Sequence, residues 1–219
     1  MCKPGPRRRP VPSPRSNPML RLHANSFSGN GYKIRLLLTQ LGMPFERVDY
    51  DIDRGQTRTP EFLKLNPNGR IPVLEFEDGR VLAESNAILS YLAEGTPHLP
   101  QDRFERALVL QWMFFEQYSH EPNVATLRYW ITHNLLDDER RAMVEGKRRW
   151  GYAALDVMEQ HLAGRRYFVG ECYSIADIAL YAYTHVAHEG GFDLARYAAI
   201  RRWLERVAAE PRHVPITAV

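Results

Sequence analysis

The stretch IPVLEFEDGRVLAESNAILSYLA, residues 71–93, decides the fold of the first half of this 219-residue chain. Two short apolar segments, IPVLEFE (71–77) and RVLA (80–83), flank Asp78-Gly79, a pair typical of a tight β-hairpin. Ser85 then precedes apolar residues at helical spacing, which predicts a helix with Ser85 as its cap. The stretch therefore predicts two antiparallel strands followed by a helix.

The residues before this stretch predict a β-α-β unit. MLRLHA (19–24) and PFERVDYD (44–51) both alternate in the manner of strands. Between them, Asn30 to Leu41 carries apolar residues at helical spacing, so the two strands are parallel if this helix crosses over. A short helix near 60–65 and the turn NPNG (66–69) then lead into the hairpin.

After a linker at 95–100 the pattern becomes entirely helical. From Arg103 onward no convincing strand is found, and four stretches show helical periodicity: 103–118, 138–162, 174–188 and 197–209. The sequence thus predicts an α/β domain over residues 19–95 followed by an all-helical domain over residues 102–219.

Residues 1–18, MCKPGPRRRPVPSPRSNP, differ in composition from the rest. They are rich in Pro and Arg, which predicts a disordered leader, and they lack the apolar core of a secretory signal. They also hold five basic and no acidic residues, which leaves 24 basic against 26 acidic residues in the remainder. A general nucleic-acid-binding surface therefore loses its support.

Two other classes of protein are also disfavoured. No apolar run approaches the roughly 20 residues that span a membrane. With only Cys2 and Cys172, a zinc site built on several thiolates is excluded, and no other metal site is expected. Sparse cysteine favours a reducing compartment, so we expect a cytoplasmic protein.

The junction SFSGNGYK (26–33) is the first candidate site. Small polar residues there meet the start of a helix, where free N–H groups and the helix dipole favour an anion. Ordinary capping by Ser28 or Asn30 is the simpler alternative. A dinucleotide site is disfavoured, because Ile34 replaces the third glycine and an antiparallel hairpin follows.

Two further pairs suggest a peptide-like ligand. Ile71-Pro72 can be cis, which would turn the Ile71 N–H and C=O outward to pair with an extended peptide. Glu84 can bind an ammonium group while Ser85 and the helix start bind a carboxylate. A trans proline that merely starts the strand, and a purely structural Glu-Ser pair, are the alternatives. Ser174-Ile175-Ala176-Asp177 matches a capping box and is interpreted as a folding element.

Taken in this order, these features resemble the cytosolic glutathione transferases. The matching pieces are the 28–33 junction, NPNGRIPVL (66–74), ESNAILSYLA (84–93) and SIADIALYAY (174–183), and the resemblance covers nearly everything from Met19 on. It implies a thioredoxin-like N-terminal domain that binds glutathione and a helical C-terminal domain. It also implies a homodimer with a role in detoxification, with glutathione as co-substrate and no permanently bound cofactor.

The resemblance assigns roles to particular residues. Ser28 takes the active-site hydroxyl position, and Asn30 stands where bacterial nu-class-like members carry an asparagine near the sulfur. Pro72 becomes the cis proline, and Ile71 pairs with the cysteinyl backbone. Glu84 and Ser85 are expected to bind the γ-glutamyl group, and Gln56 and Thr57 the glycyl end. The second-substrate pocket is expected to contain Phe27, Tyr118 and His120.

The implied chemistry is activation of a thiol. A free thiol has a pKa of about 8.5, and hydrogen bonds from Ser28 and Asn30 would stabilise the thiolate for attack on an electrophilic small molecule. No cysteine lies in the junction, which argues against a mixed disulfide with the protein. Two alternatives remain: a glutathione-dependent disulfide-bond oxidoreductase, and a non-catalytic relative that binds a partner.

Overall fold

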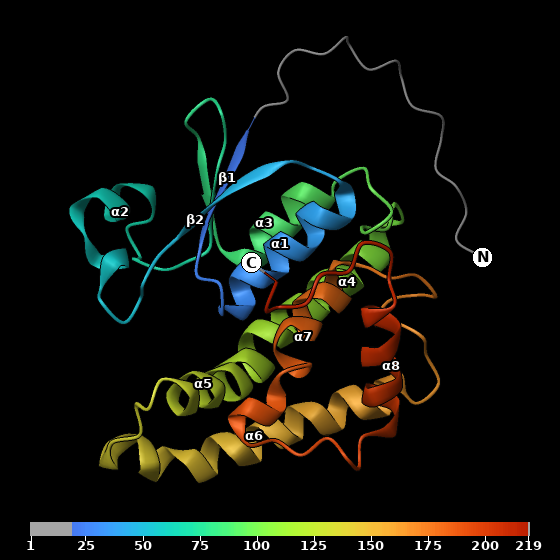
Figure 1. Ribbon diagram of the computed structural model, residues 1–219. Helices are drawn as coiled ribbons and strands as arrows, with labels where there is room; N and C mark the ends of the chain where they lie inside the picture. The colour runs from blue at the N-terminus through green and yellow to red at the C-terminus, as the bar shows by residue number, and fades with distance from the viewer. Residues whose placement is uncertain (1–18, 219) are drawn as a thin grey trace. The chain divides into compact units, whose positions relative to one another are not determined.

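The computed structural model of the chain describes residues 19–218. The predicted disordered leader, residues 1–18, lies outside the described residues. The described chain forms two compact units: one runs up to Pro97 and resumes at Pro211, and the other is His98–Glu210 (Figure 1). The sequence assigned everything after residue 102 to the helical domain, whereas residues 211–218 belong to the first unit.

The first unit is built on a four-stranded mixed sheet. Its strands are β1 (Leu20–Ala24), β2 (Phe45–Asp49), β3 (Val73–Glu75) and β4 (Val81–Ala83), in the order β2-β1-β3-β4. β1 and β2 are parallel, and the other two pairings are antiparallel. The crossover and the hairpin predicted this arrangement, although β3 has three residues where the sequence indicated seven.

The turn between β3 and β4 is wider than Asp78-Gly79 suggested. The last ladder pair joins Glu75 to Val81, and the N–H of Phe76 donates to the carbonyl of Arg80 at 2.9 Å. Gly79 has a φ of 81°, the left-handed conformation that glycine adopts without steric cost. The hairpin is therefore a longer loop with glycine at its left-handed position.

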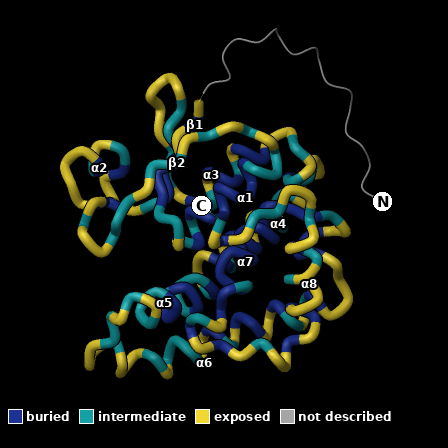
Figure 2. The backbone as a smooth tube through the Cα atoms, in the orientation of Figure 1, coloured by how far each residue is buried: buried dark blue, intermediate teal, exposed yellow. Residues whose placement is uncertain are grey.

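Helices α1 (Gly29–Leu41) and α3 (Ser85–Ala93) pack against each other in this unit, and Figure 2 colours their buried residues dark blue. They cover the sheet face that carries the buried Leu20, Leu22 and Ala24 of β1. The short η1 (Gln56–Arg58) and α2 (Pro60–Leu65) follow β2. The predicted helices near 30–41 and 60–65 are confirmed.

The second unit consists of helices, and its described residues contain no strand. Its elements are α4 (Arg103–Phe115), the π-helix η2 (Glu116–His120), α5 (Glu121–Thr132), α6 (Asp138–Leu162), α7 (Ile175–Thr184), η3 (Ala187–Gly190) and α8 (Ala198–Ala208). All ten residues of α7 are buried, and α4, α5 and α8 contact it (Figure 2). A helix that is apolar on every side is suited to this central position.

Helix α5 was not predicted from the sequence. Glu121-Pro122-Asn123 looks like a break after the preceding helix, yet the chain stays helical through Pro122, which stands in the first turn of α5 directly after the π-helix. The π-helix carries the chain from α4 into α5 without a loop. None of the described helices is long and apolar enough to cross a membrane.

The predicted capping box at Ser174 is confirmed. The carboxylate of Asp177 accepts four hydrogen bonds: from Ser174 N and Oγ (both 3.0 Å), Phe168 N (3.1 Å) and Trp203 Nε1 (2.9 Å). Burial raises the pKa of Asp177 to about 6, although these four hydrogen bonds act to lower it. The motif therefore ties the start of α7 to its surroundings.

Candidate functional site

The register of the sheet brings three candidate motifs to the same edge, where β1 and β4 end and β3 begins. These motifs are the 26–33 junction, the Ile71-Pro72 pair and the Glu84-Ser85 pair. His23 of β1 pairs with Val73, and Val73 pairs with Ala83 of β4. Two residues further along each strand, in the direction of this edge, stand Asn25, Ile71 and Ser85. The β1–α1 junction, the Ile71-Pro72 bond and the start of α3 are therefore neighbours, as the sequence interpretation requires.

Ser28 is the N-cap of α1. Its Oγ accepts a hydrogen bond from Gly31 N at 3.2 Å, which satisfies one free donor of the first turn. The ordinary capping role is thus present. It does not use the hydroxyl proton of Ser28, which has no acceptor among the described residues and can be donated to a ligand.

Asn30 and the start of α3 are joined by hydrogen bonds. Ser85 Oγ donates to Asn30 Oδ1 at 3.1 Å, and Lys33 Nζ donates to Ser85 Oγ at 3.4 Å. Lys33 and Ser85 are buried, at 0% and 4% exposure. This chain fixes the Asn30 amide with its oxygen toward Ser85.

The helix cap of α3 is Glu84, one residue earlier than the sequence indicated. Ser85 is the first helical residue, and no side chain caps this helix start. Glu84 is exposed and has φ 68° and ψ 112°. This conformation is disfavoured for a residue with a Cβ, and such strained residues cluster at active and ligand-binding sites.

The Ile71-Pro72 bond is cis, as the sequence interpretation proposed. The ladder between β1 and β3 ends at the pair His23–Val73, so Ile71 lies beyond the last paired residue. Its N–H and C=O have no hydrogen-bond partner among the described residues. An extended peptide can therefore pair with Ile71 as a short added strand.

Gln56 and Thr57 lie in η1, after β2. Tyr50 N donates to Ala24 O at 2.8 Å, so the end of β2 is held beside the end of β1. Arg58 Nη1 donates to Asn68 O at 2.9 Å, which holds η1 against the turn before Ile71. Gln56 is exposed, and its Oε1 accepts from Asp51 N, whereas Thr57 is buried.

The three residues predicted for a second pocket differ in exposure. Phe27 and Tyr118 are 63% and 86% exposed. His120 is fully buried, and its Nε2 lies 3.0 Å from Thr184 Oγ1 of α7. Its ring packs within the helical unit. Within residues 19–218 no group of three or more His, Cys, Asp or Glu side chains is placed to hold a metal.

Lys33 is the residue of this site that the sequence interpretation left without a role. A lysine in the second turn of a helix resembles an ordinary surface residue. Its buried position follows from α3 packing against α1, a contact between segments 52 residues apart in the chain. No local pattern could have indicated it.

Comparison with known proteins agrees with this geometry. The glutathione S-transferase N-terminal domain family matches residues 19–94, and the C-terminal domain family matches residues 112–211. The chain is 33% identical over 200 residues to the disulfide-bond oxidoreductase YfcG of Escherichia coli, covering 83% of this chain and 87% of YfcG. It is also 33% identical over 202 residues to glutathione S-transferase 3 of Zea mays, covering 88% and 90%.

A solved structure is closer in sequence. The crystal structure of a glutathione S-transferase from Pseudomonas fluorescens Pf-5 has 54% identity and a TM-score of 0.89, covering 91% of this chain and all of that one. Both domain matches, and the order of the two units, agree with the predicted thioredoxin-like and helical architecture. The chain therefore belongs to the glutathione S-transferase family.

Proposed function

We propose that this protein is a glutathione transferase that binds glutathione along the sheet edge and activates its thiol. The observation that carries the proposal is the convergence of three ligand-ready groups: the uncapped start of α3 with Glu84, the unpaired backbone of Ile71, and the Ser28 hydroxyl. Glutathione has a matching group for each of them: an ammonium and carboxylate at its γ-glutamyl end, a peptide backbone, and a thiol.

The γ-glutamyl end is assigned to the start of α3. Glu84 pairs with the ammonium group, and the free N–H groups and the dipole of α3 stabilise the α-carboxylate. Ser85 is a positioning residue in this proposal, because its hydroxyl holds Asn30. The cysteinyl backbone pairs with Ile71 beside Pro72, and Gln56 and Thr57 contact the glycyl end.

The sulfur then lies at the start of α1. The Ser28 hydroxyl and the Asn30 NH₂ donate to the thiolate, and the dipole of α1 adds to the stabilisation, so the pKa of the bound thiol falls below about 8.5. The thiolate attacks an electrophilic carbon, forms a carbon–sulfur bond and displaces the leaving group. We assign the protein to the bacterial nu-class-like transferases because its Ser28–Asn30 junction resembles theirs.

We assign the second-substrate pocket to Phe27, Tyr118 and His120 on the resemblance to the family. We also assign the protein to the cytoplasm and to detoxification of small molecules. No permanently bound cofactor is needed, because glutathione supplies the reacting sulfur.

A second activity is favoured by one specific similarity. The chain matches the disulfide-bond oxidoreductase YfcG over most of both sequences, and no cysteine lies in the junction. Two glutathione molecules would then reduce a small disulfide to two thiols and leave as glutathione disulfide, without a protein cysteine. The third alternative is that the protein is a non-catalytic relative that binds a partner.

Calorimetric titration with reduced glutathione and with glutathione disulfide, followed by turnover assays, separates these readings. Saturable binding of reduced glutathione with conjugation to an aryl halide supports the transferase. Preference for the disulfide, with faster reduction of a small disulfide, supports the oxidoreductase. Binding without any turnover supports the non-catalytic reading, and no binding of either form overturns the proposed site.

A homodimer is supported by exposed apolar side chains on α4. Leu110 and Phe114 are 44% and 70% exposed and lie four residues apart, which places them on one stripe of the helix. We assign this stripe to contact with a second copy. Phe114→Glu should convert the dimer to monomer in sedimentation velocity, whereas Trp150→Gln, at an exposed aromatic on α6, should leave it unchanged.

A further inference from the structure

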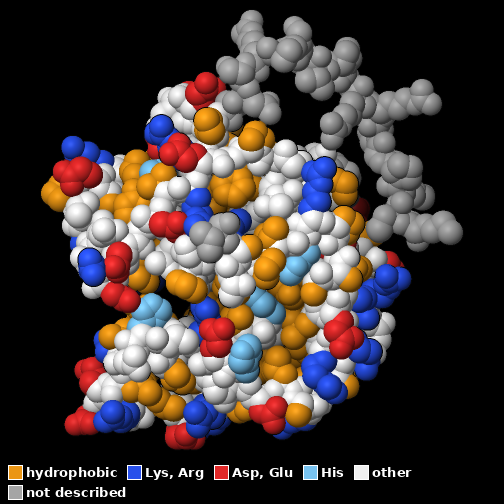
Figure 3. Space-filling model, in the orientation of Figure 1, with side chains coloured by type: hydrophobic (Ala, Val, Ile, Leu, Met, Phe, Trp, Pro, Cys, Tyr) orange, Lys and Arg blue, Asp and Glu red, His pale blue; other side chains and the backbone are white. Residues whose placement is uncertain are grey.

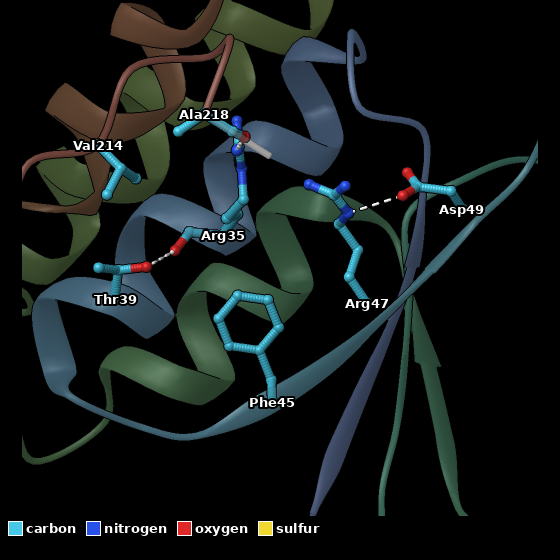
Figure 4. A pocket seen from close by; sticks show the side chains of 7 residues that line it. All are labelled: Arg35, Thr39, Phe45, Arg47, Asp49, Val214 and Ala218. Atoms are coloured by element: carbon cyan, nitrogen blue, oxygen red, sulfur yellow. Dashed lines mark hydrogen bonds and ion pairs between the residues drawn. The ribbon is translucent and has the colours of Figure 1, made fainter.

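A cavity of about 410 Å³ lies on the first unit, on the α1 side of the edge strand β2. Helix α1, strand β2 and the C-terminal segment 214–218 form its walls (Figure 4). Its lining residues are Arg35, Thr39, Phe45, Arg47, Asp49, Val214 and Ala218. The volume is within the range of small-molecule sites.

Arg35 anchors one wall. It is 8% exposed, and it donates to the carbonyls of Pro215 (3.3 Å), Ile216 (2.6 Å) and Ala218. Burial lowers the pKa of Arg35, and the like charge of Arg47 lowers it further. Arg35 therefore holds the C-terminal segment in place, and its positive charge lies near a second guanidinium.

Arg47 is the group that faces the cavity. Its Nε donates to Asp49 Oδ2 at 2.8 Å, and its side chain is 19% exposed. In Figure 4 its guanidinium points toward Arg35, away from the sheet. Its two terminal nitrogens have no hydrogen-bond partner among the described residues. They present two parallel N–H donors, the geometry that a carboxylate accepts.

The remaining walls are apolar. Phe45 contributes an aromatic ring from the start of β2, and Val214 contributes an aliphatic side chain from the C-terminal segment (Figure 4). The two arginines and Asp49 leave one net positive charge in the lining. That charge balances one carboxylate, whereas a phosphate dianion would remain uncompensated beside Asp49.

From these observations we infer that the cavity is a binding site for a small aromatic carboxylate, separate from the proposed glutathione site. The carboxylate pairs with the terminal nitrogens of Arg47, and the aromatic ring packs against Phe45 and Val214. The bound anion also offsets the repulsion between Arg47 and Arg35. Arg47 lies on the edge strand β2, and a charged side chain there can also discourage aggregation between sheets. That role requires neither the cavity nor the neighbouring Arg35.

The test is calorimetric titration of the full chain with 2-naphthoate in the presence of saturating glutathione, with 2-naphthamide as the neutral analogue. We expect saturable naphthoate binding with a dissociation constant below about 1 mM and at least about tenfold weaker binding of the amide. Amide shifts in the nuclear magnetic resonance spectrum should concentrate at Thr39 and along Phe45–Asp49.

The chain provides a matched control for Arg47. Arg80 pairs with Asp78 through Nε at 2.7 Å, as Arg47 does with Asp49, but lies in the exposed hairpin loop. Arg47→Gln should weaken naphthoate binding at least about tenfold, and Arg80→Gln should leave it unchanged. Equal binding by parent and Arg47→Gln, displacement by glutathione, or no saturable binding would each overturn the assignment.

Discussion

Helices α7 and α3 both begin with a serine and an acidic residue, but they use them in opposite ways. At α7, Asp177 is fully buried and accepts four hydrogen bonds, so the helix start is satisfied by the protein itself. At α3, the N-cap residue Glu84 is exposed and adopts a disfavoured backbone conformation, and its side chain makes no capping hydrogen bond. The difference teaches that the acidic residue of one motif stabilises the fold, while the Glu84 carboxylate of the other makes no capping hydrogen bond and is assigned to ligand binding in the proposed function.

The largest expected effect is on the α7 side. Asp177→Ala leaves four donors without their acceptor in a buried region, and we expect a loss of more than about 3 kcal/mol in the free energy of unfolding. Asp102 is the matched control, because it caps α4 through Phe104 N and Glu105 N at the surface. Asp102→Ala should cost about 1 kcal/mol. Equal losses in urea denaturation would remove the distinction.

The effect next in size is on turnover. Ser28→Ala combined with Asn30→Ala removes both side-chain donors to the thiolate, so kcat/KM should fall by about 10²–10³ while glutathione still binds. Ser90→Ala, whose hydroxyl donates to Asn86 O inside α3, serves as the control and should be unaffected. Unchanged turnover in the double variant would show that the junction is only a helix cap.

The pH dependence of stability tests the burial of Asp177. Its pKa is about 6 in the folded protein and 3.8 is its ordinary value, so between these values the folded state retains a proton that the unfolded state loses. The contribution of Asp177 to stability therefore falls as pH rises from about 4 to about 6. The stability of the parent relative to Asp177→Asn should decline over this interval by about 1–3 kcal/mol. A flat difference would contradict the raised pKa.

The smallest expected change in stability is at Glu84, where backbone strain and glutathione binding can be measured separately. Glu84→Gly relieves the positive φ and should raise the free energy of unfolding by about 1 kcal/mol, while glutathione binding weakens at least about tenfold. Glu84→Gln should weaken binding without the gain in stability. Asn134 also has a positive φ, of 55°, but asparagine tolerates it. Asn134→Gly should change neither quantity, and a Glu84→Gly variant that binds normally would refute the assignment.

Much of the fold could be predicted from periodicity and turn residues. The two parallel strands, the hairpin and the long helix over 138–162 follow from local patterns that agree with the final packing. Helix α5 was missed because Pro122 looks like a terminator when its position in the first turn is unknown. The return of residues 211–218 to the first unit depends on contacts such as Tyr32 Oη with Val214 O, 182 residues apart.

The candidate site was predictable in its residue types but not in its connections. The pairs Ile71-Pro72 and Glu84-Ser85 follow from short motifs, and the register of the sheet brings them together. That Ser85 holds Asn30, and that Lys33 is buried beside them, depends on how α3 packs against α1. Such contacts have no local sequence pattern. Figure 3 shows charges of both signs interspersed over the face in view.

The most direct test of the central claim is the pKa of the glutathione thiol when it is bound to the protein. Thiolate absorbance in the ultraviolet, followed against pH at saturating glutathione, gives this value for the parent and for the Ser28→Ala, Asn30→Ala double variant. We predict a pKa clearly below about 8.5 in the parent and a return toward that value in the variant. A bound thiol that titrates near 8.5 in both proteins would contradict activation by the start of α1.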